Sequence, residues 1–238
     1  AGEGMNLGTA GFILLLALAL PAFEETKGNW RAQSDFAVTF LDRYGNVIGT
    51  RGIKHNDAIP LEDFPDHLVK ATLATEDRRF FEHFGIDFGG TFRALLTNAR
   101  AGGVVQGGSS ISQQLAKNLF LSNDRTWRRK FQEIAMAIWL EGRFTKDEIL
   151  ALYLSRVYFG AGAYGIEAAA ERYFDRPARE LTLLQASMIA GLVKAPSRLN
   201  PARQDIAAAR DRATVVLDEM VNMGYISAAE RAAALQQE

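Results

Sequence analysis

The stretch that says most about this chain reads Glu76-Asp77-Arg78-Arg79-Phe80-Phe81-Glu82-His83-Phe84-Gly85. It follows an apolar segment and combines paired carboxylates with guanidiniums, an imidazole and phenylalanines. Apolar neighbours that remove a carboxylate from water raise its pKa, which makes it a better general base near neutral pH. Taken alone, four charged residues in a row are more often a solvated helix end, because charged side chains are mostly exposed. Glu76 is therefore a candidate base whose assignment depends on the rest of the sequence.

A second polar segment reads Gly107-Gly108-Ser109-Ser110-Ile111-Ser112-Gln113-Gln114-Leu115-Ala116-Lys117-Asn118. Ser109 or Ser110 can cap a helix here, on which Gln113 and Lys117 stand four residues apart and share one face. Amide and ammonium groups on one surface suit sugar hydroxyls and phosphate. The glycines allow close backbone approach, and a helix N-terminus favours an anion. The alternative is an ordinary polar helix face behind a flexible loop.

A third cluster contains Arg125, Arg128, Arg129, Lys130 and Glu133. One interpretation of the cluster is a basic helix face exposed to solvent, with no function of its own. The functional interpretation is a pyrophosphate clamp, because arginine binds phosphate oxygens through two parallel hydrogen bonds. Arg129 and Glu133 are four residues apart on the expected helix and can form an ion pair.

The composition sets limits on the class of protein. With 238 residues, 48% hydrophobic and 23% charged, the chain is an ordinary globular sequence with a substantial core. The net charge of −1 argues against a nucleic-acid partner. The absence of cysteine excludes disulfides and cysteine-ligated zinc, and the three histidines have no metal-ligand spacing.

Residues 4 to 23 carry no charge and are mostly apolar. A helix needs about 20 such residues to cross the hydrocarbon core of a membrane. A cleavable signal peptide and a buried core helix are the alternatives, but we expect a transmembrane anchor over residues 1–23. Residues 24–35 are expected to be a linker and residues 36–238 the catalytic domain, in a fragment whose start has been removed.

The remaining sequence predicts a mainly α fold. A small β-hairpin is expected over residues 36–41 and 47–50, around Gly45-Asn46. Helices are expected to begin at Pro65, Thr126 and Thr182. Two Ser/Thr-x-x-Glu capping boxes are expected, Thr145 with Glu148 and Ser227 with Glu230. Glycines between residues 160 and 165 predict a bend.

Together these segments resemble the peptidoglycan glycosyltransferases, glycosyltransferase family 51. Five motifs stand in order between residues 76 and 201, the fourth and fifth reading from Lys146 to Ser155 and from Ala190 to Ser197. The resemblance implies that Glu76 is the catalytic base and Glu133 the second essential carboxylate. It assigns substrate binding to Asp77, Gln113, Gln114, Lys117, Asn118, Arg125, Arg129, Lys130 and Ser155. It assigns scaffold roles to Phe80, His83, Gly85, Gly108 and Ser110. The family commonly has asparagine where Ser155 stands.

The resemblance implies a lysozyme-like domain with two lobes, anchored by a single transmembrane helix. The domain would lie on the outer, periplasmic side of the bacterial cytoplasmic membrane. It would polymerise lipid II into glycan strands with inversion and with release of undecaprenyl pyrophosphate. A Mg²⁺ or Mn²⁺ ion is plausible beside Glu133, although no metal motif appears in the sequence. The chain resembles the glycosyltransferase part of a class A penicillin-binding protein, with a monofunctional enzyme as the alternative.

Two rival functions remain: a muramidase-like hydrolase, which needs an acid for a sugar leaving group, and a non-catalytic membrane scaffold. The basic cluster disfavours the hydrolase, because glycan cleavage involves no phosphate.

Residues 84–107 carry glycines at both ends and an apolar middle. We expect this segment to be a mobile flap that touches the membrane; the alternative is a helix packed into the core.

Overall fold

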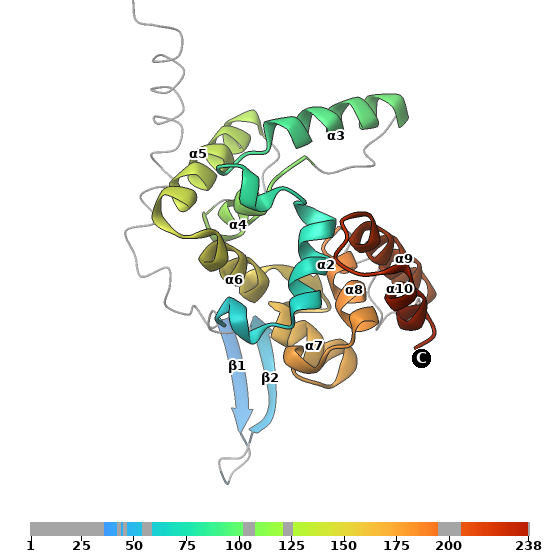
Figure 1. The fold of residues 1–238 in the computed structure, drawn as a ribbon. Coiled ribbons are helices and arrows are strands. Elements are labelled where there is room, and N and C mark those ends of the chain that lie inside the picture. The colour runs from blue at the N-terminus through green and yellow to red at the C-terminus, as the bar shows by residue number, and fades with distance from the viewer. Residues whose placement is uncertain are drawn as a thin grey trace, which may run out of the picture. The chain divides into compact units, whose positions relative to one another are not determined.

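The computed structural model describes residues 36–41, 44, 47–53, 59–101, 108–120, 126–194 and 206–237. The described chain is mainly helical, with one antiparallel hairpin near its start, which confirms the predicted mainly α class and the small N-terminal hairpin (Figure 1). The expected anchor and linker, residues 1–35, lie outside the described residues. Among the helices of the described ranges, none is both long enough and apolar enough to cross a membrane.

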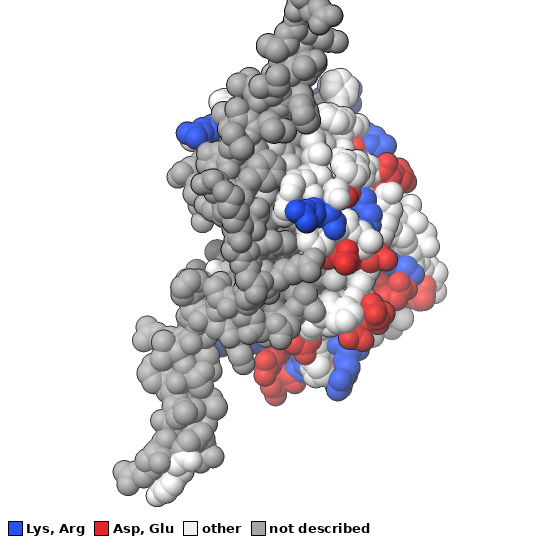
Figure 2. Space-filling model, turned by 90° about the vertical axis from the view of Figure 1, so that its left-hand side faces the viewer, with Lys and Arg blue, Asp and Glu red and all other residues white. Residues whose placement is uncertain are grey.

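The chain forms two compact units. The first, called here the Glu76 unit, comprises residues 33–78 and 150–238. The second, the Glu133 unit, has its described residues between Arg79 and Ile149. On the part of one face that Figure 2 shows in colour, both acidic and basic side chains occur.

The hairpin of the Glu76 unit is formed as predicted. Strand β1 (Phe36–Leu41) pairs antiparallel with β2 (Val47–Ile53), with a register shift between Phe40 and Leu41. A short 3₁₀ turn, η1 (Leu61–Asp63), leads to α2 (Asp66–Glu76), which is preceded by Pro65 as expected. Proline suits this position because its fixed φ is compatible with a helix start.

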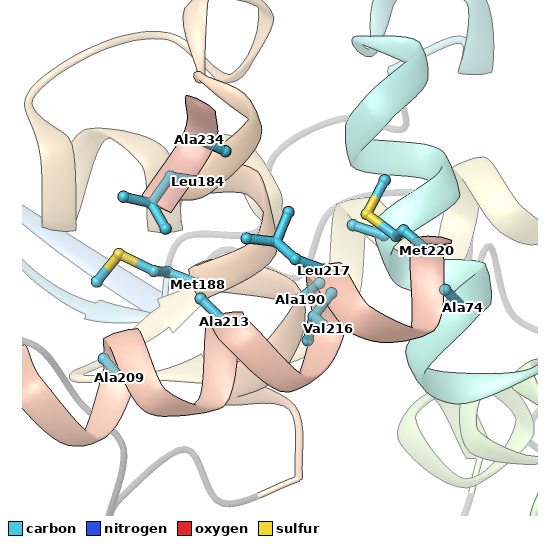
Figure 3. Close-up of a cluster of buried hydrophobic side chains, with 11 residues drawn as sticks. Ala74, Leu184, Met188, Ala190, Ala209, Ala213, Val216, Leu217, Met220 and Ala234 are labelled. Carbon is cyan, nitrogen blue, oxygen red and sulfur yellow. The ribbon is translucent and has the colours of Figure 1, made fainter. Parts of the chain in front are cut away.

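Four helices of the Glu76 unit contribute to a shared apolar cluster. Helix α2 contacts both α8 (Leu183–Leu192) and α9 (Ile206–Asn222), and α10 (Ala228–Leu235) adds Ala234. Figure 3 shows Val216, Leu217 and Met220 on α9 together with Ala190 of α8. Full burial of a leucine or methionine side chain stabilises the fold by about 1.5–3 kcal/mol. This packing holds the end of α2, where Glu76 lies.

Side-chain caps explain several helix starts in both units. Thr182 and Gln185 form a capping box at α8, and Ser227 and Glu230 form the predicted one at α10. The Thr145 backbone N–H donates to Glu148 Oε2 at 2.8 Å, and Glu148 N–H donates to Thr145 Oγ1 at 3.2 Å. This confirms the other predicted box, which starts α6 (Lys146–Arg156).

A second hairpin replaces the simple bend expected at residues 160–165. Strands β3 (Tyr158–Gly160) and β4 (Ala163–Tyr164) pair antiparallel before α7 (Ile166–Phe174). Gly165 has φ +81, and a Cβ there would lie 2.3 Å from the Ser155 carbonyl oxygen. Glycine is therefore required by both backbone conformation and space. The 3₁₀ turn η3 (Ala178–Glu180) then leads toward α8.

The Glu133 unit is built on three helices. These are α3 (Phe88–Ala101), α4 (Ile111–Phe120) and α5 (Trp127–Arg143). Helix α5 begins as predicted at Thr126, whose hydroxyl accepts the Arg129 backbone N–H at 3.2 Å. Helices α4 and α5 pack together. The 3₁₀ turn η2 (Phe80–Glu82) precedes α3 and buries Phe80 completely.

Candidate active site

Glu76 is the last residue of α2 and is half-buried. Asp77 follows as the C-cap and is only 6% exposed, with its backbone N–H donating to the Leu73 carbonyl at 3.0 Å. The pKa of the fully buried Tyr153 hydroxyl is raised well above its ordinary value, first by burial and then by the negative charges of Glu76 and Asp77. Glu76 thus influences a fully buried tyrosine, and its predicted role as the general base stays a prediction.

Three cations from different segments have charge interactions with Glu76 or lie close to it in the chain. Arg78 forms an ion pair with Glu219 of α9, with 2.5 Å between Nη2 and Oε2. Partial removal from water lowers the pKa of Lys194, and attraction by Glu76 opposes that shift. Burial also lowers the pKa of Arg212, again opposed by Glu76 and then by Glu219. The sequence placed Lys194 in the fifth motif, but Arg212 lies in no motif and was missed.

Ser155 is 2% exposed, and its hydroxyl accepts the backbone N–H of Ile59 at 3.2 Å. It therefore connects α6 to the segment that follows the first hairpin. The predicted role of Ser155 in substrate binding stays a prediction.

In the Glu133 unit, Gly85 and Ser110 join the first motif to the second. Gly85 has φ +72, and a Cβ there would lie 3.2 Å from the backbone of Ala137. The Ser110 hydroxyl donates to the Gly85 carbonyl at 2.5 Å. Nearby, the His83 ring lies edge-on to the Phe80 ring, with 6.2 Å between centroids. These contacts hold the first motif against the second, and the scaffold roles of His83 and Gly85 stay predictions.

The polar residues of α4 separate into buried and exposed groups. Ser110 N–H donates to Gln113 Oε1 at 2.8 Å, while Gln113 N–H donates to Ser110 Oγ at 3.2 Å. This reciprocal cap leaves Gln113 only 3% exposed. Gln114 is half-buried, whereas Lys117 and Asn118 are exposed. Of the predicted ligands on this helix, Lys117 and Asn118 are the most accessible to a substrate.

Glu133 is 3% exposed and pairs with Arg129, as the spacing predicted, and also with Lys130, which was not predicted. Arg129 Nη1 donates to Glu133 Oε2 at 3.2 Å, and Lys130 Nζ donates to Glu133 Oε1. Lys130 Nζ also donates to Ser109 Oγ at 2.8 Å. The buried carboxylate therefore aligns a guanidinium and an ammonium beside the N-terminal end of α4. Arg125, the remaining predicted cation, lies outside the described residues.

The cations that pair with Glu133 among the described residues are Arg129 and Lys130, and the expected Mg²⁺ or Mn²⁺ ion stays a prediction. Both Glu133 carboxylate oxygens already accept from a cationic side chain. Within the described ranges, no group of three or more His, Cys, Asp or Glu side chains could hold a metal ion.

A network that the sequence did not reveal supports the first two motifs. Ser112 Oγ donates to Glu141 Oε1 at 2.5 Å, and Lys146 Nζ pairs with the same oxygen at 2.7 Å. The Lys146 ammonium also lies 4.3 Å from the centroid of the Phe80 ring. Glu141 and Lys146 come from separate helices, so only tertiary packing shows that they meet Ser112 and Phe80.

Comparison with known proteins agrees with these observations. Residues 44–221 match the family model described as "Transglycosylase". The chain belongs to this transglycosylase family. It is 44% identical over 221 residues to penicillin-binding protein 1A of Aquifex aeolicus (strain VF5), covering 91% of this chain and 30% of that protein. It is 47% identical over 184 residues to penicillin-binding protein 1A of Escherichia coli (strain K12), covering 77% and 21% respectively.

A solved structure shares the fold of this transglycosylase chain. The crystal structure of penicillin-binding protein 1A from Haemophilus influenzae aligns with a TM-score of 0.53 and 27% sequence identity. The alignment covers 87% of this chain and 21% of that one. The transglycosylase chain thus spans less than a third of the length of these relatives.

Proposed function

We propose that this chain is a peptidoglycan glycosyltransferase that polymerises lipid II into glycan strands. The observation that carries the proposal is the pair of cations held by buried Glu133, because a glycosyl donor with a pyrophosphate leaving group needs preorganised positive charge. Membership of the transglycosylase family supports the same reaction class. The similarity to penicillin-binding proteins 1A favours a larger bifunctional parent over a monofunctional enzyme.

In the proposed reaction, Glu76 takes the proton from the 4-hydroxyl of the acceptor's N-acetylglucosamine as that oxygen attacks the donor's anomeric carbon. The bond from this carbon to the pyrophosphate oxygen breaks, and the configuration inverts. Arg129, Lys130 and exposed Lys117 stabilise the charge on the departing undecaprenyl pyrophosphate. Glu133 acts indirectly, by keeping Arg129 and Lys130 in position.

We also propose that the Glu133 unit contacts the outer surface of the cytoplasmic membrane. It exposes large apolar side chains, among them Phe81, Phe84, Phe88, Phe92, Leu96, Trp127 and Phe131. On α3, Phe88 is 76% and Phe92 61% exposed, which is the opposite of the core-packed helix considered as the alternative. Apolar side chains on a helix surface insert into the headgroup region of a bilayer. The lipid tails of the substrate then remain in the membrane during transfer.

Incubation of the purified protein with lipid II, and separately with intact cell-wall sacculi, tests the proposed reaction. Glycan polymer from lipid II with release of undecaprenyl pyrophosphate is expected, and the sacculi should remain uncleaved. Soluble fragments from sacculi without polymer would favour the muramidase. Absence of both products would favour the scaffold.

A further inference from the structure

Glu141 has a buried side chain and lies in none of the five motifs. It stands near the end of α5, and its side chain is only 3% exposed. Its Oε1 accepts from Ser112 Oγ at 2.5 Å and from Lys146 Nζ at 2.7 Å. Removing two charges from water costs free energy that their attraction often fails to recover, so an apolar side chain can serve stability equally well. Stability alone therefore does not explain a glutamate at this position.

The two partners of Glu141 belong to two different motifs. Ser112 lies in the second motif, and Lys146 opens the fourth. The Lys146 ammonium also lies 4.3 Å from the centroid of the Phe80 ring, which belongs to the first motif and is completely buried. A cation over an aromatic ring is attracted to it, most strongly where water is excluded. One carboxylate thus holds together parts of three motifs within the Glu133 unit.

The hydrogen bond from Ser112 constrains the rotation of α4 about its axis. Helix α4 begins at Ile111, so Ser112 is inside it. The bonds of Ser109 and Ser110, in contrast, act before the helix begins. Successive residues of an α-helix are about 100° apart around the axis. A rotation of α4 by one residue would therefore bring apolar Ile111 against the Glu141 carboxylate, so the bond favours one setting of α4 against α5.

The same rotation decides where Lys117 points. Ser112 is completely buried, whereas Lys117, five residues further along α4, is exposed. Five residues correspond to about 140° of rotation, so the two side chains lie on different faces of the helix. A contact that fixes the buried face also fixes the direction of the exposed one. Cationic groups stabilise developing charge best when they are held in place before the reaction.

We propose that Glu141 is a positioning residue that acts through Ser112 and α4 on Lys117. It sets the rotation of α4 and thereby presents the Lys117 ammonium to the pyrophosphate of the glycosyl donor. The inference rests on the proposed function for the identity of this ligand. Lys146 supplies the countercharge for the buried carboxylate from α6. If this is its role, Glu141 contributes to pyrophosphate binding only while Lys117 is present.

A double-mutant cycle on the full 238-residue chain tests this role. The variants are Glu141→Met, Lys117→Ala and the two combined, and calorimetry measures the dissociation constant for undecaprenyl pyrophosphate in detergent micelles. Glu141→Met should bind about 3- to 10-fold more weakly than the wild type. In the Lys117→Ala background the same change should cost less than about 2-fold, because the ammonium that Glu141 positions is already gone. Losses that multiply in the double variant would overturn the inference.

Glu148→Ala is the matched control for a loss of stability. Glu148 is exposed on α6 and accepts the Thr145 backbone N–H at 2.8 Å, so its removal weakens a helix cap without touching α4. This variant should bind undecaprenyl pyrophosphate like the wild type. A loss of affinity as large as that of Glu141→Met would show that affinity follows stability, which would overturn the inference.

If Glu141→Met fails to fold, Ser112→Ala takes its place in the cycle, because it removes only the hydroxyl that Glu141 binds. Additive behaviour of Ser112→Ala with Lys117→Ala would overturn the inference as well. The kcat/KM for lipid II polymerisation is measured on the same variants and should show the same coupling. If the binding data show the coupling but the wild type makes no polymer, the proposed function fails and the positioning role of Glu141 stands.

Discussion

Glu76 and Glu133 are the same residue type in two different settings. Glu76 ends a helix, is half-buried, and lies in the field of cations from neighbouring segments. Glu133 lies inside α5, is almost fully buried, and has an ion pair on each oxygen. A carboxylate whose oxygens are both held by cations is poorly suited to accept a proton. The contrast indicates a reactive role for Glu76 and an organising role for Glu133.

The largest effect is expected for Glu76→Gln, which tests whether Glu76 is the reactive carboxylate of the two. The amide keeps the shape of the side chain but cannot accept the acceptor's proton. Lipid II polymerisation should fall by about 100- to 10,000-fold, the usual cost of losing a general base. Thermal unfolding should stay near that of the wild type. Turnover close to wild type would remove Glu76 from the mechanism.

Glu133→Gln should combine a severe loss of activity with a loss of stability, unlike Glu76→Gln. The change removes the negative charge between Arg129 and Lys130 and leaves two cations close together. Because Lys130 is 36% exposed, water screens part of the cost, and we expect destabilisation of about 1–3 kcal/mol. Polymerisation assays and urea unfolding check the two effects. A variant with full stability and wild-type rate would contradict the organising role.

Lys117→Ala should lower activity without altering stability, because the side chain is exposed on α4. Loss of one cation that contacts the leaving group costs roughly 10- to 100-fold in rate and also weakens donor binding. Titration with a non-reactive donor analogue measures the affinity directly. Lys146→Ala is the matched control for stability, since Lys146 supports Glu141 and Phe80 from within the same unit. Unchanged rate and donor affinity in Lys117→Ala would count against the pyrophosphate clamp.

The smallest effect is expected for Ser155→Ala, which tests the contribution of one hydrogen bond within the Glu76 unit. Its hydroxyl accepts one backbone hydrogen bond, so the variant should lose about 1 kcal/mol of stability and little activity. Denaturant unfolding and the polymerisation rate check both parts. A tenfold loss of rate in a stable variant would instead support the predicted contact between Ser155 and substrate.

Much of the fold was predictable, because interactions between residues close together in the sequence determine where helices begin. Pro65, Thr126, Thr145 and Ser227 act on helix starts within a few residues, so the sequence predicted them correctly. The β3–β4 hairpin was not predicted, because each strand is very short. In the sequence, the only sign of the hairpin is a glycine-rich bend. The ion pair between Arg129 and Glu133 was also predictable, because the two residues are only four positions apart on one helix.

By itself the sequence determined the fold class, the family and the candidate carboxylates, because these depend on residue types at short spacing. Only the tertiary structure decided what surrounds each carboxylate. The Glu141 network and the packing of Arg212 over Gly191 join residues from separate helices, and no local pattern encodes such contacts. Burial and distance set the strength of charge interactions. The different environments of Glu76 and Glu133 are therefore a property of the packed fold.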